Sequence, residues 1–291
     1  LSLHDALPIY GYAPGLRRPF IPGQSTLSDE DFAAAFLAAP KSVKENLDET
    51  FEQLALFGGE AGAMTPVAIS EYGPLIYPID ETHLVEDLSW NRNITAALYL
   101  ASLYHMLLAE PRIAWANHLP LLQGGFGALV GLEVTPDFQL RSWRNTTFWV
   151  FQQYVGLSGR QVLRLSTDCP TYNAEAIGIV PEVRGAPLLD CGAYRSQDGK
   201  QITVTLLNKS LSQAASVSLE PGWESFSVHK ATLFTSAGFR DENSADMPEL
   251  VIPKTFHLTA TECPSGGKLS LEVPRFSLVT LELVKGLPVE D

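Results

Sequence analysis

The stretch Pro66-Val67-Ala68-Ile69-Ser70-Glu71-Tyr72-Gly73 decides how the first half of this chain folds. A short apolar run, too brief for a helix, ends in a carboxylate, an aromatic residue and a glycine. Such a run predicts a β-strand that is buried on both faces. In parallel α/β architectures, active sites lie at the carboxyl ends of buried strands. Because an ionised carboxylate beside an apolar core is costly, Glu71 is either a catalytic group or a helix-capping or salt-bridged residue.

The residues on both sides of this strand predict alternating helices and strands. Capping boxes, proline and glycine stops and apolar periodicity set the expected bounds. The predicted elements are a helix over Phe32–Ala39 that Pro40 ends, a helix from Ser42 to Gly58-Gly59, the strand before Gly73, a well-buried helix over about Asn91–Glu110, a strand over Arg112–Asn117, and a helix from Asn145 or Thr146 to Gly156. This order is typical of the end of a parallel βα array.

Beyond Gly156 the pattern changes to short segments of alternating polarity. Turn signals separate these segments, and Asp198-Gly199 is a hairpin signature. The expected strands are Val162–Leu165, Leu188–Tyr194, Ile202–Leu207, Ala215–Leu219, Ser225–Phe234, Lys268–Val273 and Phe276–Val284. The second half is therefore predicted to be an all-β sandwich of jelly-roll type.

Composition limits the classes of partner and cofactor. The chain has 291 residues, 45% of them hydrophobic, and a net charge of −13, which argues against nucleic acid and anionic membrane as partners. The six histidines are dispersed, without the spacing of a metal site, so we expect no metal and no cofactor. The three cysteines, Cys169, Cys191 and Cys263, show no disulfide framework. Free thiols are favoured, while a single Cys191–Cys263 or Cys169–Cys191 bond stays open.

The chain is expected to be a fragment with two structural parts. Residues 1–9 resemble a translated sequencing adapter, so the natural sequence should begin near Tyr10. We expect residues 10–156 to be the C-terminal portion of a (β/α)₈ barrel and residues 157–287 to be the β-sandwich. The fold class is thus α/β plus all-β. A complete barrel of this kind needs about 250 residues. Cellular location stays unknown, because any leader sequence would lie in the lost part.

Several segments together resemble a known enzyme family. They are Ile69–Gly73, the helix from Asn91, Ala114–Leu119, Trp149–Tyr154, Val180-Pro181, Leu188–Tyr194, Asp198-Gly199, Leu206–Ser210 and Leu271–Leu278. In order and spacing they resemble the last barrel segments and the C-terminal domain of family 51 α-L-arabinofuranosidases. The resemblance covers nearly everything from about Tyr10 to Lys285.

The resemblance implies a retaining glycosidase with Glu71 as the catalytic nucleophile. Retaining glycosidases use a second carboxylate as general acid and base. In this family that residue is the Glu of an Asn-Glu pair, and no Asn-Glu pair occurs in the chain. We expect this absence if the chain is a fragment that lacks the first part of the barrel. Glu81, Glu86 and Glu110 are poor substitutes, and Glu133 is only slightly better placed.

The resemblance also suggests residues that bind the sugar. They are Tyr10, Tyr72, Asn117, His118 and Gln123. The family commonly has a Gln at about the place of Pro120 and a Trp at about the place of Leu75, so this sequence departs from the pattern at both positions. For His118, a satisfied core histidine is the alternative.

Two classes of function are therefore left open. The first is a retaining α-L-arabinofuranosidase that acts on arabinose-containing oligosaccharides or polysaccharides of hemicellulose; within the enzyme class, the alternative is a pyranoside-specific glycosidase of the same superfamily. The second is a non-catalytic carbohydrate-binding or vestigial relative that keeps Glu71 without the reaction. Assembly of the whole protein into a homo-oligomer also stays open.

Overall fold

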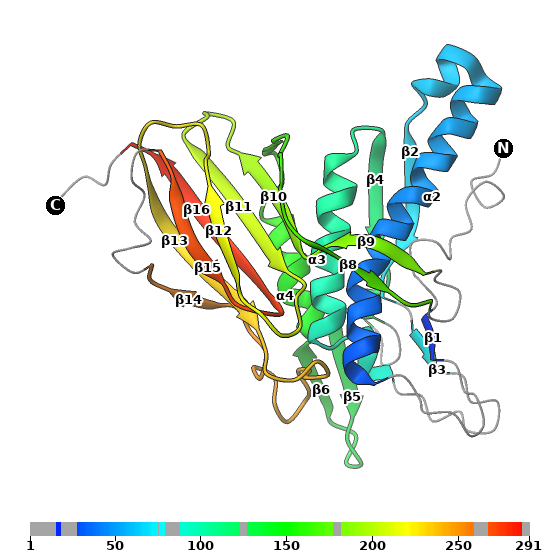
Figure 1. The fold of residues 1–291 in the computed structure, drawn as a ribbon. Coiled ribbons are helices and arrows are strands. Elements are labelled where there is room, and N and C mark those ends of the chain that lie inside the picture. Colours follow the sequence, from blue (N-terminus) through cyan, green and yellow to red (C-terminus); the bar gives the residue numbers. More distant parts are fainter. Residues whose placement is uncertain are drawn as a thin grey trace.

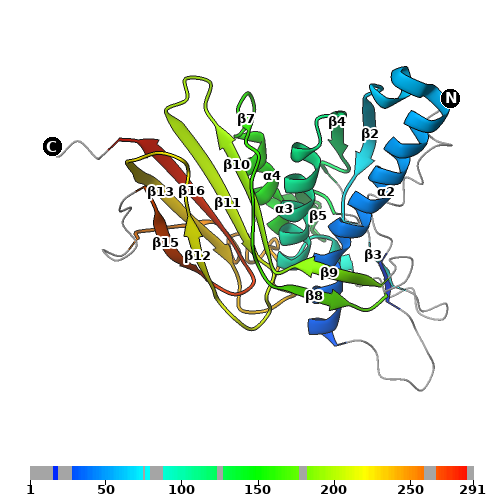
Figure 2. The same cartoon turned by 45° about the horizontal axis from the view of Figure 1, so that its top comes forward.

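The computed structural model describes residues 16–18, 28–74, 76–78, 88–122, 127–176, 182–258 and 267–286. Helices lie between a six-stranded sheet of the second half and a two-stranded parallel sheet of the first half (Figures 1 and 2). The helices are α2 (Asp29–Ala63), η2 (Leu88–Asn91), α3 (Ile94–Ala109) and α4 (Thr146–Val155). The strands of the first half are β1 (Leu16–Arg18), β2 (Val67–Tyr72), β3 (Ile76–Pro78), β4 (Ile113–His118), β5 (Val130–Val134) and β6 (Leu140–Arg144). Those of the second half are β7 (Gln161–Val162), β8 (Thr171–Ala174), β9 (Val183–Pro187), β10 (Leu189–Arg195), β11 (Gln201–Asn208), β12 (Ala215–Leu219), β13 (Phe226–Thr235), β14 (Lys254–Phe256), β15 (Leu269–Val273) and β16 (Ser277–Lys285).

One long helix, α2, replaces the two helices predicted before the strand that ends at Gly73. Ser28 caps it, accepting a hydrogen bond from the Asp31 backbone N–H at 3.1 Å. The helix then runs through Pro40, so the prediction that Pro40 ends it is wrong. Proline inside a helix costs about 3 kcal/mol. Pro40 is itself buried within a run of core residues of α2, and this packing offsets the cost. The non-helical backbone is instead at Gly59, where φ is 59°.

The predicted strands at residues 67–72 and 113–118 form a parallel pair joined by α3. Tyr72 pairs with His118, and the register is irregular between Ile69 and Tyr72. Val67, Ile69 and Tyr72 are buried in the core shared with the helices, whereas Ser70 is exposed. The prediction that this strand is buried on both faces is therefore wrong among the residues that the structure describes.

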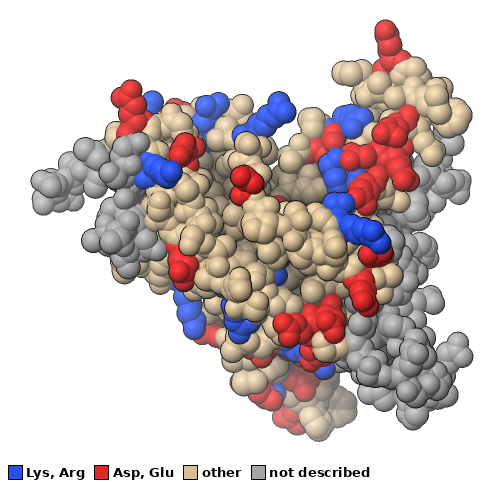
Figure 3. Space-filling model, viewed as in Figure 1, with Lys and Arg blue, Asp and Glu red and all other residues tan. Residues whose placement is uncertain are grey.

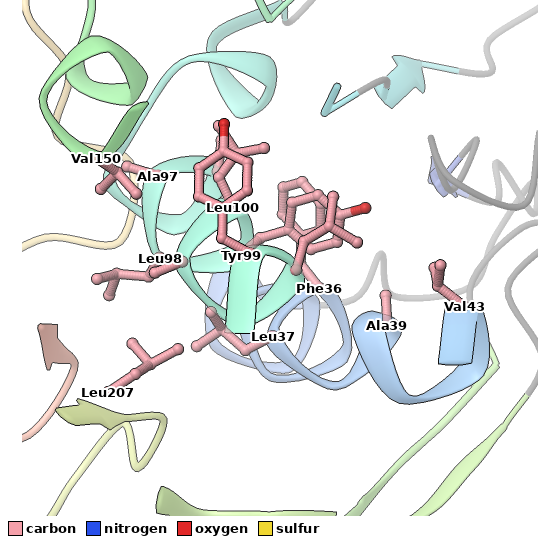
Figure 4. Packing of buried hydrophobic residues seen from close by; sticks show 14 of the residues in the cluster. Phe36, Leu37, Ala39, Val43, Ala97, Leu98, Tyr99, Leu100, Val150 and Leu207 are labelled. Carbon is pink, nitrogen blue, oxygen red and sulfur yellow. The ribbon is translucent and has the colours of Figure 1, made fainter. Parts of the chain in front are cut away.

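Helix α3 is buried on nearly all sides, as its sequence predicts. Asn93 caps it, accepting a hydrogen bond from the Ala96 backbone N–H at 3.0 Å. Its neighbours are α2, α4 and the sandwich strands β10, β11 and β16. Leu37 of α2, Leu98 of α3 and Leu207 of β11 meet in one cluster, so the helical part and the sandwich share a core (Figure 4).

The antiparallel β5–β6 hairpin, which the sequence analysis did not predict, lies between β4 and α4. Trp143 lies so close to Gly131 that a Cβ at this glycine would stand 2.3 Å from the indole ring. The hairpin projects beyond the carboxyl ends of β2 and β4 (Figure 1).

The second half forms the predicted β-sandwich. Its main sheet has six strands in the order β14-β13-β16-β11-β10-β7, and the β12–β15 pair packs against it. The Asp198-Gly199 turn joins β10 to β11, as predicted, and Gly199 has φ 72°. The side chains between the two sheets make a separate apolar core that includes Val204, Leu271 and Leu281.

Three strands of the second half were not predicted: β8, β9 and β14. The β8–β9 hairpin packs on α2, and the Tyr172 hydroxyl donates a hydrogen bond to the Ala34 carbonyl at 3.1 Å. Residues after Gly156 therefore return to the helical part.

Charged side chains gather on the outer face of α2 (Figure 3). Lys41 pairs with Glu45, and Lys44 pairs with Asp48, at the i,i+4 spacing that supports a helix. Among the described helices, none combines the length and apolar character needed to cross a membrane.

Candidate functional site

Glu71 lies near the carboxyl end of β2, on the face that points away from the helices. The next residue, Tyr72, is buried on the helix side, and successive side chains of a strand point to opposite faces. Glu71 is half-buried and makes no hydrogen bond or ion pair with any residue that the structure describes. Neither the capping nor the salt-bridge alternative is thus seen for this carboxylate within those residues.

Asn117 is the neighbour of Glu71 on the adjacent strand. Because Tyr72 and His118 pair in register, the residues that precede them stand at the same level of the two strands. Asn117 is exposed, and its Nδ2 donates a hydrogen bond to the Ser70 carbonyl at 3.2 Å. Its amide oxygen thus stays available to a hydroxyl group beside Glu71.

Tyr72 and His118 lie on the opposite face and are part of the packing. The Tyr72 hydroxyl is 3.2 Å from that of Tyr104 in α3, and burial raises the pKa of Tyr72 to about 12. The His118 ring lies 5.3 Å from the Tyr72 ring and 5.5 Å from that of Phe151 in α4. These contacts hold the strand ends against the helices, while sugar binding by the two residues stays a prediction.

The His118 imidazole also fastens the loop that follows β4. Its Nε2 lies 3.1 Å from the Gly127 carbonyl, so Nε2 carries the proton. Burial lowers the pKa of His118 to about 4, and the bond to Gly127 offsets part of this effect. His118 is therefore a neutral hydrogen-bond donor at neutral pH.

Two glycines allow close backbone approach beside the site. A Cβ at Gly73 would stand 2.4 Å from the Leu119 carbonyl oxygen, and a Cβ at Gly127 would stand 2.7 Å from the Pro74 ring. The ends of β2 and β4 can therefore come together only because these positions lack side chains.

Other predicted site residues are not beside Glu71 or lie outside the described part of the chain. Tyr10 and Gln123 lie outside the described residues, as do Glu81 and Glu86. Glu110 precedes β4, at the end of the sheet opposite to Glu71, and pairs with Arg112 at 3.0 Å. Glu133 lies in the β5–β6 hairpin, 3.5 Å from Arg141.

A second polar cluster, which the sequence analysis missed, joins α3 to the sandwich. Asp190 of β10 accepts a hydrogen bond from the Ser102 hydroxyl at 2.5 Å and lies 3.4 Å from His105 Nδ1 and 3.7 Å from Lys209 Nζ. On its other side, His105 Nε2 lies 2.7 Å from Thr205 Oγ1 and 2.6 Å from the Tyr154 hydroxyl. In the sequence, the only sign of this cluster was the i,i+3 spacing of the polar residues Ser102 and His105 on a helix predicted to be buried.

Charge compensation determines how this cluster titrates. Burial acts to raise the pKa of Asp190, but His105, Lys209 and Ser102 outweigh it and hold the pKa well below the ordinary value of 3.8. Burial lowers the pKa of Lys209, and Asp190 opposes that shift. The cluster joins the helices and the sandwich without reaching Glu71.

Nearby, Cys169 and Cys191 are free thiols, and burial raises the pKa of Cys191 to about 12. Cys263 lies outside the described residues.

Comparison with known proteins finds a family that the region from β5 to the start of β16 resembles. Residues 133–277 match the family model of the alpha-L-arabinofuranosidase C-terminal domain. The resemblance to family 51 arabinofuranosidases, expected from the sequence, is confirmed, and no curated protein matches the chain.

Solved structures share the fold of the matched residues and of the helical part before them. The GH51 arabinofuranosidase from Xanthomonas axonopodis pv. citri has a TM-score of 0.69 and 20% identity, and the match covers 92% of this chain and 51% of that protein. An alpha-L-arabinofuranosidase from Thermotoga maritima, in an arabinose complex, gives 0.68 and 16%, with coverage of 88% and 50%. A 4-O-alpha-L-rhamnosyl-beta-D-glucuronidase from Fusarium oxysporum gives 0.53 and 13%, with coverage of 88% and 50%. The chain thus spans about half the length of these proteins.

Proposed function

We propose that this chain is the C-terminal part of a retaining α-L-arabinofuranosidase that acts on hemicellulose side chains, with Glu71 as its nucleophile. The observation that carries the proposal is the half-buried carboxylate of Glu71 at the end of a parallel strand, next to the exposed amide of Asn117 and without a partner among the described residues. The family match over residues 133–277 supports the same class of enzyme.

The chemistry requires two carboxylates. Glu71 would attack the anomeric carbon of the arabinofuranosyl group and form a glycosyl-enzyme, while Asn117 holds a sugar hydroxyl. The acid and base would come from a part of the enzyme outside this chain, because Glu110 and Glu133 are paired with arginines. In the proposed whole enzyme, α2, β2, α3, β4 and α4 are the closing part of a (β/α)₈ barrel.

An activated substrate tests the nucleophile without the missing acid. Dinitrophenolate leaves without protonation, so 2,4-dinitrophenyl α-L-arabinofuranoside should transfer one pentosyl group to Glu71 of the 291-residue chain. Deglycosylation lacks its base, so the adduct should accumulate without turnover. Peptide mass spectrometry should locate it on Glu71.

Matched variants decide the outcome. Glu71→Gln should abolish the adduct, whereas Glu133→Gln, at an exposed carboxylate of the β5–β6 hairpin, should leave it unchanged. An adduct on another residue, or none in the parent chain, would contradict the proposal.

A pyranoside-specific enzyme is the second candidate. It is favoured by one observation, the fold likeness to the rhamnosyl-glucuronidase from Fusarium oxysporum at a TM-score of 0.53. Faster labelling of Glu71 by the 2,4-dinitrophenyl β-D-xylopyranoside than by the arabinofuranoside would support this candidate.

A further inference from the structure

The tip of the β5–β6 hairpin exposes three large apolar side chains. Val134 and Leu140 are register partners on the two strands and are 66% and 68% exposed. Phe138, in the turn between them, is 88% exposed. Exposed apolar side chains that gather in one place, rather than singly, mark a surface that contacts another molecule.

The backbone holds Phe138 in a conformation that a bulky residue rarely adopts. Its φ is 60°, in the left-handed region that favours glycine. The Thr135 carbonyl accepts a hydrogen bond from the Phe138 N–H at 2.9 Å, and the Thr135 Oγ1 accepts one from the Gln139 N–H at 3.0 Å. Because the Phe138 ring is not part of a core, the fold gains little from an aromatic residue at this strained position. Strain of this kind is typical of positions that bind a ligand.

The base of the hairpin is fastened to the sandwich. Arg141 of β6 donates a hydrogen bond to Asp246 at 2.6 Å, and the Asn243 side chain donates one to the Arg144 carbonyl at 3.1 Å. Asp246 and Asn243 both lie in the segment between β13 and β14. The tip is therefore presented on a braced stem, which lowers the entropy that binding costs.

The hairpin begins at the end of the β2–β4 sheet where Glu71 lies. The Val130 N–H donates a hydrogen bond at 3.0 Å to the carbonyl of Leu121, which follows β4. Figure 1 shows the hairpin projecting beyond the carboxyl ends of β2 and β4. At about 3.3 Å per residue, the chain from Val130 to Val134 carries the tip roughly 13 Å farther out.

This position suits the part of a substrate that stays outside the catalytic pocket. An enzyme that removes a side group binds this group at its nucleophile, while the main chain lies at the rim of the site. The pyranose rings of a neutral main chain present C–H faces, which pack well against an aromatic face. The net charge of −13 disfavours both a polyanion and a second copy of the chain as partners of the tip.

We propose that Phe138 is a binding platform for the neutral pyranose main chain of a branched hemicellulose whose arabinofuranosyl side group is bound at Glu71. The inference rests on the proposed function and names the part of the substrate that lies farther from the nucleophile. Val134 and Leu140 extend the apolar surface on the two sides of the turn. A single sugar at Glu71 does not reach the tip, so the platform acts on binding of the polymer and not on the chemical step.

Affinity electrophoresis tests the platform. The 291-residue chain is run in native gels that contain soluble arabinoxylan. We expect the polymer to retard the chain, and xylohexaose, which is main chain alone, to relieve the retardation more than arabinose does at the same concentration. Phe138→Gly should raise the apparent Kd about tenfold, as removal of an aromatic anchor does at interfaces. Phe138→Trp keeps an aromatic face and should retain most of the affinity.

Two comparisons separate the ring from the fold. Glycine relieves the strain at φ 60°, so Phe138→Gly should unfold at a midpoint temperature no lower than that of the parent chain. A loss of affinity in this variant is then not a loss of folding. Phe57→Ala is the matched control, because Phe57 is 83% exposed near the C-terminal end of α2, which lies opposite to the hairpin (Figure 1). It should leave the Kd unchanged.

Several outcomes would overturn the proposal. They are no retardation of the parent chain, equal Kd values for Phe138→Gly and Phe57→Ala, and competition by arabinose as strong as that by xylohexaose. Self-association of the parent chain that Phe138→Gly abolishes, measured by sedimentation velocity, would assign the tip to a second copy instead. Labelling of Glu71 by 2,4-dinitrophenyl α-L-arabinofuranoside reports the proposed function separately, and Phe138→Gly should not change it. Labelling without retardation refutes the platform alone, and retardation without labelling refutes the nucleophile alone.

Discussion

The two sheets on either side of the helices differ in how completely the chain covers them. The six-stranded sheet has the β12–β15 pair against one face and α3 against the other. The β2–β4 sheet has helices on one face, while Ser70, Trp115 and Asn117 are exposed. The sandwich is therefore a complete unit of packing, whereas the sheet that carries Glu71 depends on surroundings that the described residues do not supply.

The largest expected effect is at the interface of the complete sheet. Asp190→Asn removes the charge that compensates Lys209, whose side chain is 3% exposed. Removing one partner of a buried pair typically costs about 3–5 kcal/mol. We expect a loss of this size in the free energy of unfolding, measured by urea denaturation at pH 7.

Asp137→Asn is the control for this prediction, because Asp137 lies in the exposed β5–β6 turn. It should change stability by less than about 0.5 kcal/mol. Equal effects of the two substitutions would show that the Asp190 cluster does not hold the sandwich to α3.

Acid should act on the β2–β4 sheet through His118. The folded protein holds the pKa of this histidine at about 4, below its ordinary value of 6.5. Between pH 6.5 and 4 the unfolded chain therefore binds a proton that the folded chain does not, so stability falls as the pH falls. The loss should reach about 2–3 kcal/mol at pH 4.

His118→Gln isolates this contribution. Glutamine keeps an N–H donor for the Gly127 carbonyl but does not titrate. Urea unfolding across the pH range should show a flatter profile for this variant between pH 6.5 and 4. Asp190 should contribute only below its ordinary value of 3.8, because its folded pKa is lowered. Parallel profiles for the parent and His118→Gln would contradict the assignment.

A smaller effect is expected where the two strands of the open sheet converge. Gly73→Ala places a Cβ 2.4 Å from the Leu119 carbonyl oxygen, so the backbone must shift. Overpacking of this kind costs about 1–3 kcal/mol. Gly58→Ala is the matched control, because its Cβ would meet nothing within 4 Å. The measurement is thermal unfolding of the two variants. If Gly73→Ala is as stable as Gly58→Ala, the close approach of the two strand ends is not required.

Local signals made much of the fold predictable. The strand before Gly73, the capped helix after Asn93 and the Asp198-Gly199 hairpin all depend on residues close together in sequence. Pro40 misled the prediction because a local rule was overridden by burial of the surrounding helix. The β8–β9 hairpin was missed because its stabilising contacts are with α2, far away in the sequence.

The site was only partly predictable, for a similar reason. Glu71 was found because it follows an apolar run, and β2 does place it at a strand end. The sequence could not tell which face Tyr72 and His118 occupy, because the irregular register between Ile69 and Tyr72 sets the faces. The contacts of Asp190 with Ser102 and Lys209 depend on packing between distant segments and were not visible in any short motif.

The smallest expected effect is at an exposed charge pair of the complete sheet. Lys230 and Glu282 lie 4.0 Å apart on β13 and β16, with side chains 49% and 41% exposed. Water screens such pairs, so Glu282→Gln should cost at most about 0.5 kcal/mol in urea unfolding, and less at high salt. This sheet also contains Asp190, so the two variants test whether burial, rather than charge itself, decides the cost. A loss above about 1 kcal/mol for Glu282→Gln would show that the exposed strands also rely on ion pairs, and the contrast between a complete and an open sheet would then need another basis.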